Sequence, residues 1–416
     1  MTCNKPTIVS PQCRVVRFES CKNGGTTETM SKMKFNRIDE RALRQQITAW
    51  LLPLSIHIGP LLALHLEPGS NMNDSGLTTK RKRDDEDSEE DITVHRHRDF
   101  VHFIPICKEL VFDLDVHDFD RFCACVEKEE SIDIDSNPKK TNTTQTKILC
   151  HHCWLHIEGA YFIMQFILTQ LFGYNSANIL YVFSGGKGIH CFVNDHRAMS
   201  LSEEQRYFMY DTIHIGSGKN PKDEESVDND LCNWIIKYAT PELSATLENL
   251  FMTHVIANRN LFVKCKAFRK WFLDKLCRYY PSTYSNMIKT QAWQDLTTES
   301  SILWELLKMF EIYDFHANIT MVKPSLFIIY RLYYPIVDKG PLAMTHSIKL
   351  PFSIHTTTKN IALPFTQSFI ESPDKCSQLV TLESVCVAYN TKKEYPSLFT
   401  NGATILDEWL NMYELQ

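Results

Sequence analysis

The most informative stretch of the sequence is ELVFDLDVHDFD, residues 109–120, which sets acids into a hydrophobic strand. Asp113 and Asp115 lie two residues apart, and alternate residues of a β-strand face the same side. The two carboxylates therefore point together and repel each other unless a cation lies between them. Two interpretations stay open: a solvated strand end, or a site for a divalent cation whose oxygen shell is completed by substrate phosphates. The other acids, Glu109, Asp118 and Asp120, are expected to be solvated or capping groups.

A glycine-rich turn, SGGKGIHCF at 184–192, lies between two strand-like runs farther along the chain. Glycines at such a turn let backbone N–H groups approach an anion closely, and Lys187 adds a positive charge. Ser184 adds a hydroxyl, and the ring of His190 could reach the same anion. The alternative is a plain hairpin with a satisfied histidine. Together with the acid strand, the turn indicates a metal on one side of a triphosphate and donors on the other.

Two pairs of cysteines follow the acid strand. Cys123 and Cys125 form a C-x-C pair, and Cys150 and Cys153 form a C-x-x-C pair. Four thiolates in two close pairs suit a tetrahedral structural Zn²⁺. The adjacent histidines 151 and 152 could replace one thiolate, and the alternative is four free cysteines.

The composition limits the class of protein. With 416 residues the chain is long enough for two or three domains, and 44% hydrophobic and 23% charged residues are ordinary for a soluble globular protein. No run of about 18 apolar residues predicts a membrane span, and the first residues lack the layout of a signal peptide. Fourteen cysteines in this setting indicate reduced thiols. The net charge of −6 does not itself indicate a nucleic-acid partner.

The pattern along the chain predicts an α/β core interrupted by helices. Strand-like runs occupy 13–18, 55–59, 109–116, 178–185 and 189–193, and a buried helix is expected from residue 150 to 173. Helical periodicity dominates from about 200 to 333, and strand-like text returns at 346–355 and 360–365.

Two motifs of other enzyme classes have partial matches in the sequence. An acid pair after a strand also opens the haloacid-dehalogenase phosphatases, in which the first aspartate is the nucleophile. That fold needs a second acidic pair at the end of another strand, and Asp228 and Asp230 have no apolar strand before them. The segment HIGSGKN, 214–220, hints at a P-loop, but Ile213 and Asn220 stand where the motif needs Gly and Ser or Thr.

The order of these motifs resembles the small catalytic subunit of the archaeo-eukaryotic DNA primases. The resemblance rests on ELVFDLDVHDFD, CHHCW, YVFSGGKGIHCFV and YYPIVDKG followed by HSIKLPFSIHTTTKNIALPF, and it runs from about residue 13 to 366. It implies an α+β fold: a primase-type catalytic core of mixed sheets and helices, a mostly helical inserted subdomain and a small zinc-binding element. The implied parts are the N-terminal part of the core (1–66), a disordered charged linker (67–97), the core with acid strand, zinc element and hairpin (98–199), the helical subdomain (200–330), a return to the core (331–370) and a C-terminal tail (371–416).

The resemblance also implies roles for individual residues. Asp113, Asp115 and Asp338 match the catalytic acids that hold Mg²⁺ or Mn²⁺. The groups that match the nucleotide-binding set are Arg17, Ser184, Gly185, Lys187, His190, Lys349 and His355. The cysteines Cys123, Cys125, Cys150 and Cys153 match a structural zinc site. His57 stands where relatives often carry an acid near the nucleotide sugar.

The implied function is synthesis of short primers on a single-stranded DNA template from nucleoside triphosphates, a DNA-directed nucleotidyl transfer. Two metal ions about 3.5–4 Å apart can activate the attacking hydroxyl and stabilise the leaving pyrophosphate. Expected partners are a primase large subunit and the replication machinery. Lys80–Arg83 resembles a nuclear import signal, and a plain charged linker is the alternative. The expected location is the nucleus or a viral replication site, with the cytoplasm as an alternative. A non-catalytic replication subunit of the same fold is the other hypothesis, and the retention of all three acids argues against it.

Overall fold

The computed structural model describes residues 8–21, 27–35, 55–65, 102–115, 151–215, 224–295, 298–315, 322–372 and 378–414. The charged linker and its basic run Lys80–Arg83 lie outside these residues, as do Asp118, Asp120, Cys123, Cys125 and Cys150. No helix in the described ranges is long and apolar enough to cross a membrane.

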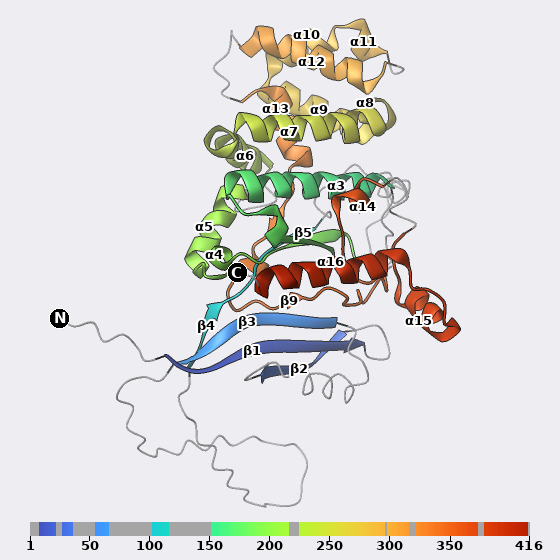
Figure 1. Cartoon of the computed structure of the whole chain (residues 1–416). Coiled ribbons are helices and arrows are strands. Elements are labelled where there is room, and N and C mark those ends of the chain that lie inside the picture. Colours follow the sequence, from blue (N-terminus) through green and yellow to red (C-terminus); the bar gives the residue numbers. More distant parts are fainter. Residues whose placement is uncertain are drawn as a thin grey trace, which may run out of the picture.

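The first antiparallel sheet is built mainly from the N-terminal strands. Its order is β2-β1-β3-β4, and β9 pairs with β3 beside β4. The strands are β1 (Ile8–Cys21), β2 (Thr27–Phe35), β3 (Ser55–His65), β4 (His102–Cys107) and β9 (Ile348–Lys349). The late strand β9 therefore returns the chain to this sheet, which lies lowest in Figure 1.

The second antiparallel sheet holds the acid strand β5 between β7 and β8. Its order is β10-β6-β7-β5-β8. The strands are β5 (Leu110–Asp115), β6 (Ile179–Phe183), β7 (Gly188–Val193), β8 (Val337–Asp338) and β10 (Leu363–Pro364). The two antiparallel sheets with separately grouped helices confirm the predicted α+β class.

The two faces of the second sheet bury different residues because side chains alternate along each strand. Leu110, Phe112 and Leu114 enter the main core beneath α3 (His151–Phe166), which continues as the π-helical turn η2 (Ile167–Leu171). Val111 faces the other way, into a smaller cluster with Leu180, Val182, Phe192, Ile348 and Ala362. Full burial of each large apolar side chain contributes about 1.5–3 kcal/mol.

The C-terminal helix covers the apolar part of that second face. α16 (Ser397–Glu414) packs Ile405, Leu406 and Trp409 against the smaller cluster, and the Trp409 indole donates to the Asn178 carbonyl at 3.1 Å. Two more helices precede it, α14 (Gln367–Ile370) and α15 (Leu382–Thr391). Asp113 and Asp115 alternate with Val111, so they lie on this same face beyond the apolar cluster.

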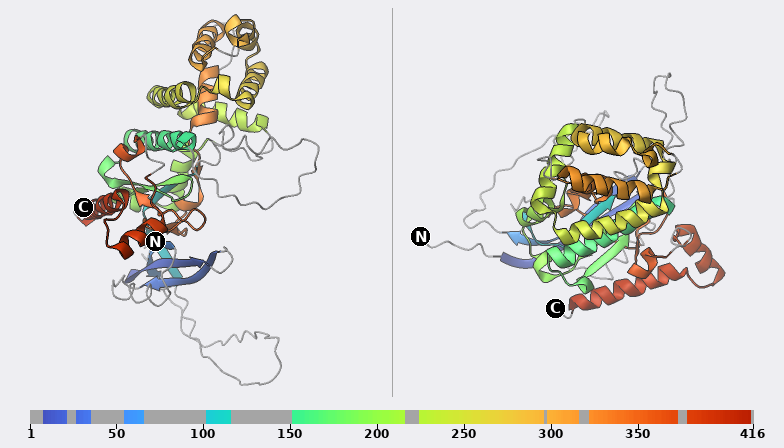
Figure 2. Two further views of the ribbon diagram at one scale, coloured as in Figure 1. Left: turned by 90° about the vertical axis from the view of Figure 1, so that its right-hand side faces the viewer. Right: turned by 90° about the horizontal axis from the view of Figure 1, so that it is seen from above.

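The helices of residues 224–333 form a layer on the far side of α3 from the sheets, whereas the two helices between residues 196 and 213 lie beside the second sheet (Figures 1 and 2). Strong start signals set them: Ser202 and Gln205 form a capping box at α5, and Thr240 caps α7 ahead of Pro241. The elements are α4 (His196–Met199), α5 (Glu203–Ile213), α6 (Glu224–Tyr238), α7 (Pro241–Phe251) with η4 (Met252–Asn258), α8 (Leu261–Lys264), α9 (Lys266–Tyr279), α10 (Pro281–Ile288), α11 (Gln291–Gln294), α12 (Ser300–Phe315) and α13 (Pro324–Tyr333).

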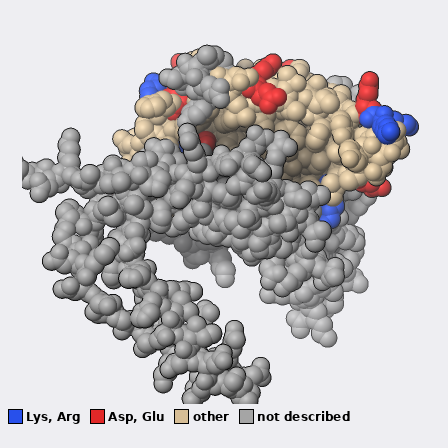
Figure 3. Space-filling model, turned by 60° about the horizontal axis from the view of Figure 1, so that its bottom comes forward, with Lys and Arg blue, Asp and Glu red and all other residues tan. Residues whose placement is uncertain are grey.

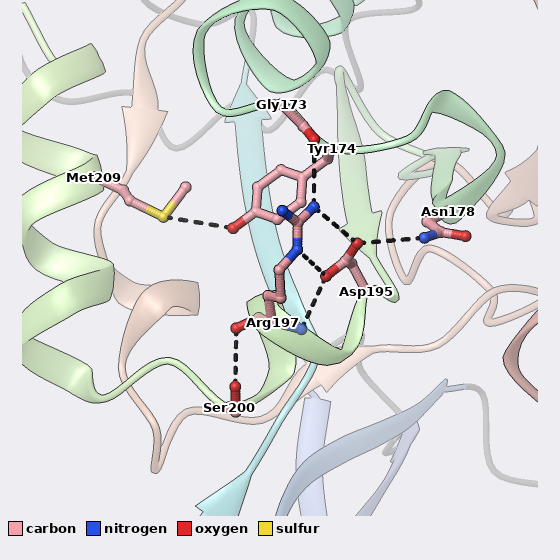
Figure 4. Close-up of polar contacts among 7 residues, drawn as sticks. All are labelled: Gly173, Tyr174, Asn178, Asp195, Arg197, Ser200 and Met209. Atoms are coloured by element: carbon pink, nitrogen blue, oxygen red, sulfur yellow. Dashed lines mark hydrogen bonds and ion pairs between the residues drawn. The ribbon is translucent and has the colours of Figure 1, made fainter. Parts of the chain in front are cut away.

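A polar cluster fixes the passage from β7 into these helices (Figure 4). Asp195 accepts from the backbone N–H of Arg197 at 2.8 Å, which caps α4, and its carboxylate also pairs with the Arg197 guanidinium at 3.2 Å. The same guanidinium donates to the Gly173 carbonyl and lies 5.7 Å from the centroid of the Tyr174 ring. This cluster belongs to the scaffold, because it lies at the end of β7 away from Gly188.

Candidate active site

Three predicted site residues lie side by side across the second sheet. The register pairs Asp113 of β5 with His190 of β7 on one side and with Asp338 of β8 on the other. Asp115, two residues on, pairs with Gly188 at the start of β7. The prediction that Asp113 and Asp115 share a face is confirmed by the regular pairing of β5, and Asp338 joins them from the neighbouring strand.

The environment of Asp113 disfavours its charge. Burial is the largest cause, and the negative charges of Asp115 and Asp338 add to it, while Lys349 acts in the opposite direction; together they raise the pKa of Asp113 to about 7. The Nε2 atom of His190 lies 3.5 Å from Oδ1 of Asp113. A cation brought to this row would relieve the repulsion among the three acids.

The carboxylates do not form a preassembled metal cage. Among the described residues, no group of three or more His, Cys, Asp or Glu side chains is arranged to hold a metal ion. Magnesium sites in phosphate-handling proteins generally use one or two carboxylates, with waters and substrate phosphates supplying the other ligands. Asp113, Asp115 and Asp338 offer carboxylate oxygens of this kind.

The glycine turn adopts the tight form that its sequence predicts. The Ser184 hydroxyl accepts from the backbone N–H groups of Gly186 and Gly188, each at 3.2 Å. Gly185 has a φ of 79°, which favours glycine, and a side-chain carbon at Gly188 would overlap the Leu114 carbonyl on β5. Ser184 thus shapes the turn with its oxygen and keeps a hydroxyl proton that it can donate to a ligand.

A second loop locks onto this turn and carries His355. Thr358 donates its hydroxyl to the Gly185 carbonyl at 2.5 Å, and the Asn360 amide donates to the same oxygen at 3.2 Å. The sequence analysis missed both residues, although the polar run TTTKN directly after His355 was a visible signal. Their effect is to hold His355 against the glycine turn.

The protonation of His355 follows from its contacts. Its Nδ1 atom accepts from the backbone N–H of Thr358 at 3.2 Å, so the neutral ring carries its proton on Nε2. Burial and then the charge of Lys349 lower the pKa of His355, which favours that neutral form. The Nε2 atom would lie 2.8 Å from a side-chain carbon placed on Gly186. His355 therefore presents an N–H donor beside the turn.

Lys349 connects the two sheets electrostatically. Its charge acts on both Asp113 and His355. In the first sheet its Cα pairs with that of His57, which in turn pairs with that of Arg17. The backbone positions of Arg17, His57 and Lys349 therefore lie in one row across the first sheet. Lys349 is the member of this row whose charge acts on Asp113 of the second sheet.

Two buried cations hold the acid strand in place. Lys108 donates to the carbonyls of Pro341 at 2.6 Å and Ala343 at 2.9 Å, which anchors the turn η5 (Gly340–Leu342) that follows Asp338. Arg206 of α5 donates to the carbonyls of Lys108 and Glu109 at 2.5 and 3.0 Å. The sequence analysis missed both residues, because side chains bound to backbone carbonyls leave no sequence motif.

Other residues singled out in the sequence do not lie among the described residues of the candidate site. Cys153 lies in the first turn of α3, and its three predicted zinc partners lie outside the described residues, so the zinc site stays a prediction. Asp228 and Asp230 lie within helix α6, which rules out the strand-end position that the phosphatase alternative needs. Asp228 is instead buried in an ion pair with Lys275 and Arg331.

Residues 132–367 match the family model described as the DNA primase small subunit. The chain is 27% identical over 291 residues to the DNA primase small subunit of Saccharomyces cerevisiae, covering 67% of this chain and 62% of that protein. The protein of the same name from Schizosaccharomyces pombe is 24% identical over 270 residues, with 63% of this chain and 53% of that protein covered.

The family model matches more than half of the chain, so the chain belongs to the DNA primase small subunit family. This confirms the resemblance found in the sequence, and the phosphatase alternative is wrong. The matches span 62% and 53% of the length of the two yeast relatives. A weaker likeness is to the polymerase domain from Mycobacterium tuberculosis Ligase D in complex with DNA. The TM-score is 0.35 and the identity 11%, over 94% of this chain and 86% of that chain.

Proposed function

We propose that the chain is a catalytic primase subunit, which joins nucleoside triphosphates into short primers on a single-stranded DNA template. The observation that supports this most directly is the row Asp338, Asp113 and His190 across three neighbouring strands. A subunit kept only for assembly has no reason to retain acids that raise the pKa of Asp113 to about 7.

The same acids would hold the divalent ions of the reaction, Mg²⁺ or Mn²⁺. The support is their mutual repulsion, which a bound cation would remove, and their oxygen donors, which such hard ions prefer. When bound, the ions would supply charge neutralisation for the attacking and leaving oxygens. Asp113, Asp115 and Asp338 are the ligands we propose.

The phosphate-binding role belongs to the groups around the glycine turn. The neutral His355 donates from Nε2, Ser184 can donate its hydroxyl proton, and Lys349 contributes a positive charge. Donors that are already fixed in place stabilise charge on a leaving pyrophosphate without reorganising during the reaction. We assign Lys187, Gly185, His190 and Arg17 to the same nucleotide.

The partners and the location of the chain are inferred from its family. We propose a primase large subunit and the replication machinery as partners, and the nucleus or a viral replication site as the location. We also propose that Cys123, Cys125, Cys150 and Cys153 bind a structural Zn²⁺.

The test is primer synthesis by the full chain. The protein is incubated with a single-stranded homopolymer, the complementary nucleotides and Mg²⁺ or Mn²⁺, with and without a large subunit. Short oligonucleotides are expected from the unmodified chain. Asp115→Asn should abolish incorporation while DNA binding persists, and Asp230→Asn, an exposed acid on α6, is the matched control. Absence of products under every condition, or full activity of Asp115→Asn, would exclude the catalytic role.

A further inference from the structure

The candidate site has two distinct sides. The glycine turn joins β6 to β7, so Ser184, Lys187 and His190 lie on the β7 side of the acid strand β5. Asp338 lies on β8, on the opposite side of β5. In an in-line displacement at phosphorus the attacking and leaving oxygens lie on opposite sides of the phosphorus atom. If the leaving pyrophosphate is held at the turn, the attacking hydroxyl must come from the Asp338 side.

An exposed cation lies on that side, directly after Asp338. The Nζ atom of Lys339 is 4.5 Å from the ring centroid of Tyr207 and 5.5 Å from that of Tyr210, both on α5. Tyr210 is itself stacked on His214, with centroids 4.4 Å apart and planes at 17°. Aromatic faces attract a cation and restrict where its long side chain can go. Lys339 is therefore held in position by rings.

Lys339 is not neutralised by a neighbouring acid. In the ranges that the structure describes, no carboxylate forms an ion pair with it, although it lies beside the acid row. The phenols beneath it do not supply a charge either, since burial, followed by Asp338 and Asp211, raises the pKa of Tyr210 to about 12. The positive charge of Lys339 is available to a ligand.

The position of Lys339 is fixed by the scaffold. The backbone N–H of Met344 donates to the Glu203 carboxylate at 2.9 Å, which ties the segment after β8 to the start of α5. The Lys108 ammonium holds the intervening turn from the other side. On the face drawn in Figure 3 the described surface is mostly uncharged, with charged side chains in small separate groups. The described part of that face carries no broad basic patch.

We propose that Lys339, held over Tyr207 and Tyr210, binds a phosphate of the nucleotide that carries the attacking 3′-hydroxyl. This inference rests on the proposed primase function and adds a residue that the nucleotide-binding set does not contain. The phosphate can come from the 3′ end of a growing primer or from the first nucleotide of a new one. Both sources present the same chemistry, a phosphate attached to a sugar whose 3′-hydroxyl faces Asp338.

The test compares Lys339→Ala with a matched control in the full chain. Lys237→Ala removes another exposed lysine, whose Nζ lies 4.8 Å from the Tyr238 ring centroid on α6. Phe208→Ala removes another exposed aromatic ring of α5. Binding of a primed single-stranded template is measured by fluorescence anisotropy at several salt concentrations, without nucleotides. Extension of the primer and synthesis of a dinucleotide from triphosphates alone are measured separately.

We expect Lys339→Ala to weaken binding or raise the primer KM about fivefold, the upper range for an exposed ion pair. If the phosphate belongs to the primer, the salt dependence of binding should fall by about one unit of log–log slope. The KM of the incoming nucleotide should stay within about twofold, because its phosphates lie on the other side of β5. A loss confined to dinucleotide synthesis would instead assign the phosphate to the initiating nucleotide, and it also supports the proposal.

The outcomes separate this inference from the proposed function. A chain that synthesises primers but shows no effect of Lys339→Ala in any arm overturns the inference and leaves the primase function standing. Equal losses in Lys339→Ala and Lys237→Ala also overturn it. A chain that binds primed DNA through Lys339 but makes no product supports the contact and overturns the primase function.

Discussion

His190 lies directly across from Asp113 on the neighbouring antiparallel strand, and 3.5 Å separates its Nε2 atom from the Asp113 carboxylate. Its ring is nearly completely buried, so it is held close to the acid row and to the glycine turn. Strand β7 thus links the glycine turn at its start to Asp113 and Asp115 on β5.

The first prediction concerns this pair. We expect His190→Ala to lower the rate of nucleotide addition about 100-fold, the effect of removing one preorganised donor from a reacting phosphate. DNA binding should change less than twofold. Single-turnover extension of a labelled primer measures the rate, and circular dichroism checks the fold. A rate within threefold of the unmodified chain would show that His190 does not contact the reacting nucleotide.

The second prediction concerns the stability of the metal-free chain. A carboxyl with a pKa of about 7 when folded and 3.8 when unfolded binds more protons in the folded state between those values. Its contribution to stability therefore falls as the pH rises from about 4 to 7. Asp113→Asn cannot ionise, so it should melt at a higher temperature than the unmodified chain at pH 8 and show a smaller difference at pH 5.

Thermal melts with and without Mn²⁺ measure this effect. The ion should raise the melting temperature of the unmodified chain more at pH 8 than at pH 5, because only the ionised carboxyl binds it. Asp230→Asn serves as the control and should show no pH-dependent difference. The same shift for Asp113→Asn at both pH values would mean that Asp113 ionises at an ordinary pH.

The core strands could be predicted from sequence because they are short runs rich in Val, Ile and Phe, and β6 and β7 are buried on both faces of the sheet. The runs predicted at 109–116, 178–185 and 189–193 correspond to β5, β6 and β7 within two residues at each end. The predictions at 346–355 and 360–365 were wrong in extent: only Ile348–Lys349 and Leu363–Pro364 form strands there, and the remaining pairing is limited to single bridges, Ile354 with Ile361 and Asn360 with Thr381. The intervening chain turns instead, with positive φ at Phe352 and Lys359.

The C-terminal helices were not predicted. The apolar stripe of α16 has no partner within its own segment, so its role becomes visible only when Ile405, Leu406 and Trp409 meet the back of the second sheet. Similarly, nothing local in the sequence pairs Asp338 with Asp113. That pairing came from the resemblance alone, whereas the shared face of Asp113 and Asp115 followed from strand geometry.

The third prediction concerns the close approach of β7 to β5. A methyl group at Gly188 would overlap the Leu114 carbonyl, and backbone cannot move aside as a flexible side chain can. Gly188→Ala should therefore destabilise the chain by about 2–3 kcal/mol and displace the glycine turn. Gly173→Ala is the control: it has open space and a φ of 68°, so about 1 kcal/mol of backbone strain is expected. Urea unfolding measures both, and equal losses would contradict the close approach.

The fourth prediction concerns zinc. The full chain should retain about one Zn²⁺ after dialysis against a weak chelator, as a closed structural site does. Cys150→Ser should release it, whereas Cys386→Ser, which changes an exposed free cysteine, should not. Elemental analysis of the purified proteins gives the content. Zinc-free unmodified protein of full activity would contradict the site.

The fifth prediction concerns the buried charges that join three helices of the helical layer. Asp228 of α6 pairs with Lys275 of α9 and, at 3.1 Å, with Arg331 of α13, and it accepts from the Tyr279 hydroxyl at 3.0 Å. Asp228→Asn leaves the buried Lys275 ammonium without its carboxylate, so a loss of about 3–5 kcal/mol is expected.

Asp230→Asn, two residues away and exposed, should change the free energy of unfolding by less than about 0.5 kcal/mol. Denaturant unfolding measures both variants, and hydrogen exchange should show the loss of protection concentrated in α6, α9 and α13. Because Asp228 lies in a structural ion pair, folded Asp228→Asn protein assayed at low temperature should keep its nucleotide addition rate. A large loss of that rate with unchanged stability would instead place Asp228 in the catalytic machinery.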